Sequence, residues 1–161
     1  MKKITIEIKW ALIFALAVLV WMLLEKLFGL HDKHIDLHYY LTNLFAIPAI
    51  WIYVLALKDK KRNFYNGQIS YKAGVVSGTI MTLIITLLYP ILQWIISEVI
   101  TPDYFTNVIN YSLETGYHAT REEAEAYFNL KSYIVGGLIW ALIIGIATTL
   151  IVMLFLRSKK S

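Results

Sequence analysis

Three of the four histidines in this chain fall within one short stretch, His31-Asp-Lys-His34-Ile-Asp-Leu-His38. If a helix begins near Asp32, His34 and His38 lie on one face, and His31 or Asp32 completes a set of donors. Imidazole and carboxylate groups bind zinc, nickel or copper. The alternative is an ordinary turn at a membrane surface, in which an aspartate caps the next helix. The stretch therefore carries the hypothesis of a divalent-metal site at His31, Asp32, His34 and His38, and we expect no other cofactor.

A line of polar residues follows one face of the third apolar stretch. Thr82, Thr86, Tyr89 and Gln93 recur at three- or four-residue spacing, and Asn43 adds a polar group to the second stretch. Together they are a candidate pathway for a transported solute. Threonine hydroxyls also bond to carbonyls of their own helix, and in that case no pathway is needed. No charged residue lies near the midpoint of any apolar stretch, which argues against active transport.

The sequence contains no recognisable catalytic motif. Cysteine is absent, and there is no His-Glu-x-x-His, Gly-x-Ser-x-Gly, phosphate-binding glycine loop or paired-aspartate motif. We therefore expect a protein that is not an enzyme.

The composition of the chain requires a lipid environment. Of 161 residues, 58% are hydrophobic and only 16% are charged, and the mean hydropathy is +0.61. Soluble domains are about 45–50% apolar and about 25% charged. The apolar residues gather in four blocks, each long enough for a membrane-spanning helix, at about 8–28, 37–57, 73–100 and 133–156. We predict an all-α polytopic membrane protein, a single domain over residues 1–161 with four transmembrane helices in a bundle.

Lysine and arginine are distributed unevenly between the two sides of this bundle. Eleven lie beside the chain ends and the 58–72 loop and four lie on the other side, which accounts for all fifteen. The larger set is Lys2, Lys3, Lys9, Lys58, Lys60, Lys61, Arg62, Lys72, Arg157, Lys159 and Lys160; the smaller is Lys26, Lys33, Arg121 and Lys131. Cytoplasmic loops are enriched in cations, so both termini are expected in the cytoplasm. The pI of about 9.2 then reflects topology, and nucleic acid is not an expected partner.

The external segment 101–132 shows helix signals. Thr101-Pro-Asp resembles a helix start and Gly116 a helix end, which predicts a short amphipathic helix on the outer membrane surface. Thr120-Arg-Glu-Glu123 matches a capping box, and we expect the helix that follows to run on into the fourth span. Glu25, at the outer end of the first span, is expected to pair with a cation such as Lys131 or to extend to the headgroups.

Small residues form a stripe on each of the last two spans. Gly74 and Gly78 lie on the third span, and Gly137, Ala141, Gly145 and Thr149 on the fourth. Because helices associate in lipid through small residues, we expect these stripes to pack together within one chain, or to form a homodimer.

The order of several short motifs resembles a known family. These motifs are Gly67-Gln-Ile-Ser-Tyr-Lys-Ala-Gly74, Tyr-Phe at 104–105, Tyr-Phe-Asn at 127–129 and the ending Leu156-Arg-Ser-Lys-Lys. They resemble the membrane family catalogued as domain of unknown function 4199, common in Bacteroidota, which implies a four-helix bacterial inner-membrane protein and supplies no activity. We expect a non-enzymatic accessory or scaffold protein that recognises a membrane partner or lipid through segment 101–131. A small transporter or channel subunit and the metal site are the alternatives.

Overall fold

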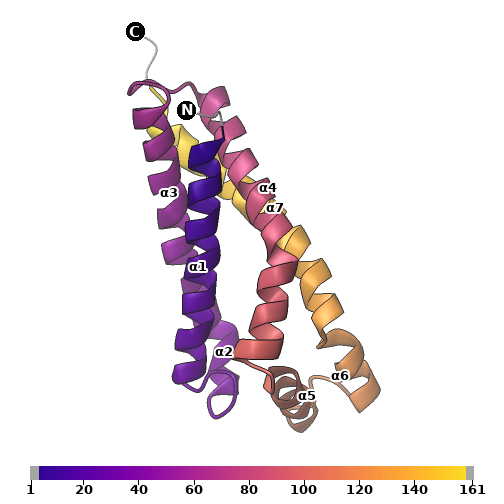
Figure 1. The fold of residues 1–161 in the computed structure, drawn as a ribbon. Coiled ribbons are helices and arrows are strands. Elements are labelled where there is room, and N and C mark those ends of the chain that lie inside the picture. Colours follow the sequence, from indigo (N-terminus) through magenta and orange to yellow (C-terminus); the bar gives the residue numbers. More distant parts are fainter. Residues whose placement is uncertain (1–3, 159–161) are drawn as a thin grey trace.

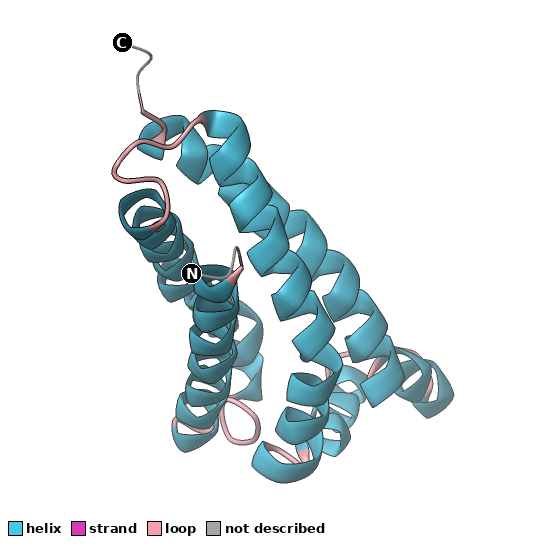
Figure 2. Cartoon of the chain, turned by 45° about the horizontal axis from the view of Figure 1, so that its top comes forward, coloured by secondary structure: helices cyan, strands magenta, loops and turns pink. Residues whose placement is uncertain are grey.

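Four long apolar helices make up most of the chain, in a computed structural model that describes residues 4–158. The described residues form helices and short connections, without a strand (Figure 2). The first span is α1 (Thr5–Leu27), and the second comprises α2 (Ile35–Leu41), the 3₁₀ turn η1 (Thr42–Phe45) and α3 (Ala46–Asn63). The third comprises α4 (Tyr71–Ile95) and the π-helical turn η2 (Ile96–Ile100), and the fourth is α7 (Leu130–Leu156). The four predicted spans are confirmed.

The bundle has two distinct ends (Figure 1). The start of α1 and the end of α7 lie at one end, which we call the terminal end. The opposite end, which we call the capped end, carries α2, α5 (Tyr104–Glu114) and α6 (Arg121–Tyr127). Four of the cations used to predict the topology, Lys2, Lys3, Lys159 and Lys160, lie outside the described residues.

The small-residue stripes of α4 and α7 face each other. A Cβ added to Gly78 would lie under 3.0 Å from Thr149, and one added to Gly145 would lie under 3.0 Å from Thr82. Gly74 and Gly137 likewise approach Met153 and Tyr89. Ala141 lies half-buried on α7. The stripes therefore pack α4 against α7 within one chain.

The outer surface of the bundle is strongly apolar. Large side chains such as Leu16, Leu87 and Phe155 are 63%, 77% and 80% exposed. Side chains of this kind on a spanning helix are solvated by lipid, which is as apolar as leucine. The exposed apolar residues are thus the surface expected of a multi-pass membrane protein.

A buried ion pair joins three helices at the terminal end. The Lys60 ammonium lies 2.8 Å from the Glu7 carboxylate, and the Ser77 hydroxyl donates to the same carboxylate at 2.6 Å. All three side chains are buried, so the pair links α1, α3 and α4. The sequence showed only a lysine in a cationic loop and a glutamate near the start of a span.

Segment 101–132 differs from the sequence prediction at two helix ends. α5 begins at Tyr104 and not at Pro102, because the Thr101 hydroxyl bonds back to the Ile96 carbonyl and ends η2. α6 does not continue into α7: Phe128 leaves the helical conformation, and Asn129 caps α7 by accepting from the Ser132 N–H.

Two other helix-end predictions in this segment are confirmed. The Thr120 side chain accepts from the Glu123 N–H and so starts α6. Gly116 has a positive φ of 70° after α5. Its N–H donates to Leu113, and that of Tyr117 donates to Ser112, which is a Schellman motif.

Candidate functional site

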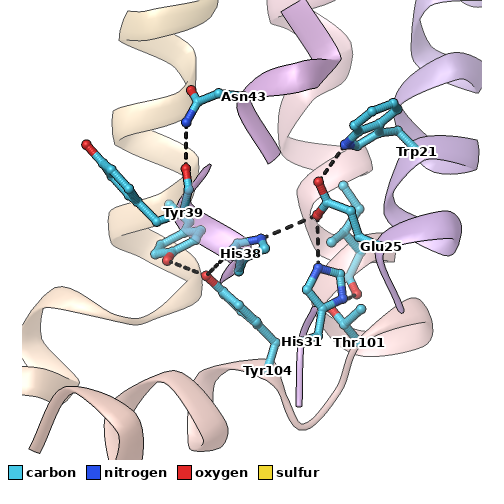
Figure 3. Close-up of polar contacts among 10 residues, drawn as sticks. Trp21, Glu25, His31, His38, Tyr39, Asn43, Thr101 and Tyr104 are labelled. Atoms are coloured by element: carbon cyan, nitrogen blue, oxygen red, sulfur yellow. Dashed lines mark hydrogen bonds and ion pairs between the residues drawn. The ribbon is translucent and has the colours of Figure 1, made fainter. Parts of the chain in front are cut away.

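A cluster of buried polar side chains lies at the capped end, around the carboxylate of Glu25 (Figure 3). Glu25 is only 2% exposed. Its Oε2 atom lies 3.1 Å from Nε2 of His31 and 3.3 Å from Nε2 of His38, and the Trp21 indole N–H donates to Oε1. Two imidazoles therefore converge on one carboxylate oxygen.

The turn between α1 and α2 brings these residues together. Gly29 adopts a positive φ of 72°, which glycine allows at no steric cost. The Leu30 N–H donates to the Glu25 carbonyl at 2.9 Å, and the His34 N–H donates to Gly29 at 2.8 Å. The chain folds back so that His31 lies beside Glu25, while α2 presents His38 from the other side.

Helix α5 closes the cluster. The Tyr104 hydroxyl lies 3.4 Å from Nδ1 of His38 and 3.1 Å from the Tyr133 hydroxyl of α7. The Asn107 side chain donates to the His31 carbonyl at 2.9 Å. Tyr104 and Asn107 therefore hold α5 against the end of the bundle.

Burial raises the pKa of Tyr104 far above its usual range, and the nearby Tyr133 and Glu25 side chains raise that pKa further. The phenol is therefore neutral and available as a hydrogen-bond donor.

The structure changes the histidine set predicted from the sequence. His31 and His38 lie in the cluster, but Asp32 and His34 are exposed, and the Asp32 carboxylate accepts the Lys33 N–H. His34 precedes α2, so the assumed helix start near Asp32 is wrong and the expected pairing of His34 with His38 is lost.

Glu25 was missed as a member of this cluster. The expectation that it pairs with Lys131 or reaches the headgroups is wrong, because His31 and His38 surround its buried carboxylate. The available signal was Trp21, one helical turn earlier, which provides an indole donor for a carboxylate at the end of a span.

The polar residues along α4 form hydrogen bonds within the helix bundle. Thr82 bonds to the Gly78 carbonyl and to the Tyr53 hydroxyl, and Thr86 bonds to the Thr82 carbonyl. Tyr89 bonds to Gln93, which bonds to Ser97. Asn43 lies apart and donates to the Tyr39 carbonyl. These polar groups bond mainly along their own helix.

A groove of about 840 Å³ lies beside the break between α6 and α7. Near the α6–α7 break it is lined by polar residues, and farther along α7 by small and apolar ones, with Tyr89 of α4 also in the lining. The polar residues are Tyr127, Asn129, Lys131, Ser132 and Tyr133, and those farther along α7 include Val135, Gly136, Gly137 and Trp140. Its volume lies within the range of about 300–1,000 Å³ that is usual for ligand pockets.

A second, apolar pocket of about 470 Å³ lies between α1 and α2. Leucines of both helices line it, and Glu25 and His34 are its charged or titratable members. The Glu25 cluster thus has a neighbouring cavity.

Four apolar helices in an all-helical bundle define a multi-pass membrane protein. The chain belongs to the family described as "Protein of unknown function (DUF4199)", which it matches over residues 9–158. Comparisons with curated proteins and with solved structures found no match.

Proposed function

We propose that this protein is a non-enzymatic accessory protein of a bacterial inner membrane that binds an anionic phospholipid in the groove beside α6 and α7. The excess of cations at the terminal end favours a cytoplasmic location for both termini. The capped end then faces outward, and the groove opens at the level of the outer headgroups.

The chemistry of the groove carries this proposal. Lys131 provides a cation at the first turn of α7, where a phosphate would lie, and Tyr127 lines the same groove. About one and a half to two and a half turns farther along α7, Gly136 and Trp140 offer apolar surface for an acyl chain. This order, from cationic and polar to apolar, matches the order of groups in a phospholipid.

The break between α6 and α7 supplies the local structure. Asn129 caps α7 with its side chain and also donates to carbonyls at the end of α6. α6 therefore leaves the axis of α7, and Tyr127 and Lys131 line the same groove.

Gly136 provides the test, because a Cβ added there meets no atom within 4 Å. Gly136→Leu should fill the groove without disturbing the α4–α7 contact. Native mass spectrometry of the full chain, released from micelles containing phosphatidylglycerol and phosphatidylethanolamine, should show retained phosphatidylglycerol on the wild type. Gly136→Leu should lose that lipid, and Lys131→Gln should lose the preference for phosphatidylglycerol.

Ile144→Phe is the matched control, because Ile144 is exposed on α7 and does not line the groove. It should retain lipid as the wild type does. Equal lipid retention by Gly136→Leu and the wild type would contradict the proposal.

A further inference from the structure

We infer that Glu25, His31 and His38 form a site for one divalent transition-metal ion, with zinc as the best match to the donors. The inference is independent of the lipid groove, which lies beside α6 and α7 and shares none of these three residues.

The spacing of the donor atoms fits a metal ion. One ligand atom from each of the three side chains lies within 4.8 Å of the other two. Both Nε2 atoms are 3.1–3.3 Å from Oε2 of Glu25. Zinc bonds of about 2.0–2.2 Å in a tetrahedron place neighbouring ligands about 3.3 Å apart. Two imidazoles and a carboxylate are a known zinc set that leaves a fourth position for water.

Hydrogen bonds do not account for every buried polar atom of the cluster. Nε2 of His38 lies close to the Glu25 carboxylate but makes no hydrogen bond in the described structure, and the atom is buried. A metal ion between His38 and Glu25 would bind this nitrogen through its lone pair.

The other ring nitrogen of His38 already faces an orienting group. Its Nδ1 lies 3.4 Å from the Tyr104 hydroxyl, which in turn contacts Tyr133. Metal-bound histidines commonly donate their second ring N–H to an acceptor, here the Tyr104 oxygen, and removing such a partner lowers metal affinity about 10–100-fold. Tyr104 is therefore a positioning residue for His38.

The apolar pocket between α1 and α2 gives the site a neighbouring space. Glu25 lines that pocket together with apolar side chains of α1 and α2. A water ligand in the fourth position would have room on this side.

The experiment uses the full chain, purified without a polyhistidine tag, freed of metal with a chelator and titrated with Zn²⁺ by calorimetry. The wild type should bind one equivalent. His31→Gln, His38→Gln and Glu25→Gln should each lose more than about 100-fold in affinity, because a lost ligand costs more than a lost orienting group. Tyr104→Phe should lose about tenfold.

His34→Gln is the matched control, since His34 belongs to the same turn but is exposed. It should bind as the wild type does. X-ray absorption at the zinc edge of the wild type should show two imidazole ligands, a result that does not depend on the folding of any variant. Absence of saturable binding, no imidazole ligand, or loss of binding in His34→Gln alone would overturn the inference.

Discussion

The hydroxyl groups of Tyr104 and Tyr133 lie 3.1 Å apart and connect helix α5 to the first turn of the final span. The Tyr104 ring also packs against the rings of His31 and His38, at 5.3 Å and 5.2 Å between centroids. One side chain thus joins α5, α7 and the turn around Glu25.

Tyr104→Phe should lower the free energy of unfolding by about 1–2 kcal/mol, because it removes a buried hydrogen-bonding group and leaves its partners unsatisfied. Reversible unfolding in mixed micelles, followed by circular dichroism, measures this loss. Tyr117→Phe is the control, since Tyr117 is 68% exposed and should change stability by less than about 0.5 kcal/mol. Equal stability of the two variants would contradict the role given to Tyr104.

The raised pKa of Tyr104 predicts a loss of stability in alkali. The unfolded phenol ionises near pH 10, whereas the buried phenol stays protonated. The contribution of the protonated Tyr104 phenol to the free energy of unfolding is therefore complete below about pH 10. It decreases as the pH rises above that value, by at most about 1.4 kcal/mol per pH unit. Unfolding measured at about pH 9 and about pH 11 should show a larger loss in the wild type than in Tyr104→Phe. Equal losses would show that Tyr104 ionises normally.

Because Glu7 and Lys60 form a buried ion pair, the free energy of unfolding should depend strongly on the presence of both partners. Lys60→Met alone should lower the free energy of unfolding by about 3–5 kcal/mol, because it leaves the Glu7 carboxylate buried without its cation. Adding Glu7→Leu should recover most of that loss, since apolar replacement of both partners is often neutral. Lys9→Met is the control: Lys9 pairs with Asp59 but is 52% exposed, so the cost should be below about 1 kcal/mol. A double variant no more stable than Lys60→Met would refute this account.

The close approach of Gly78 to Thr149 predicts that even one methyl group is harmful there. Gly78→Ala should destabilise the bundle by about 1–3 kcal/mol through overpacking. Gly136→Ala, the matched control on open surface, should be neutral or stabilising by up to about 1 kcal/mol. Thermal unfolding compares the two, and a Gly78→Ala variant as stable as Gly136→Ala would show that α4 and α7 do not pack at this point.

The sequence predicted the features that depend on local composition. Apolar blocks located the four spans, and the spacing of Gly74, Gly78, Gly145 and Thr149 located the contact between α4 and α7. Thr120 and Gly116 marked helix ends correctly because capping uses neighbouring backbone groups.

Features that depend on the path of the chain were not predictable in the same way. Glu25 meets His31 only because Gly29 reverses the chain, and Tyr104 reaches His38 from α5, 66 residues away in sequence. The α6–α7 break was missed because the residues after Glu122 favour helix and the capping role of Asn129 was overlooked.

Photocrosslinking of a lipid to the groove tests the proposed function most directly. The full chain would be reconstituted with phosphatidylglycerol that carries a diazirine in its acyl chain, irradiated and mapped by peptide mass spectrometry. Label should concentrate on residues 126–140, disappear in Gly136→Leu and persist in Ile144→Phe. Label spread evenly over the lipid-facing sides of all four spans, and unchanged by Gly136→Leu, would contradict a lipid site in this groove.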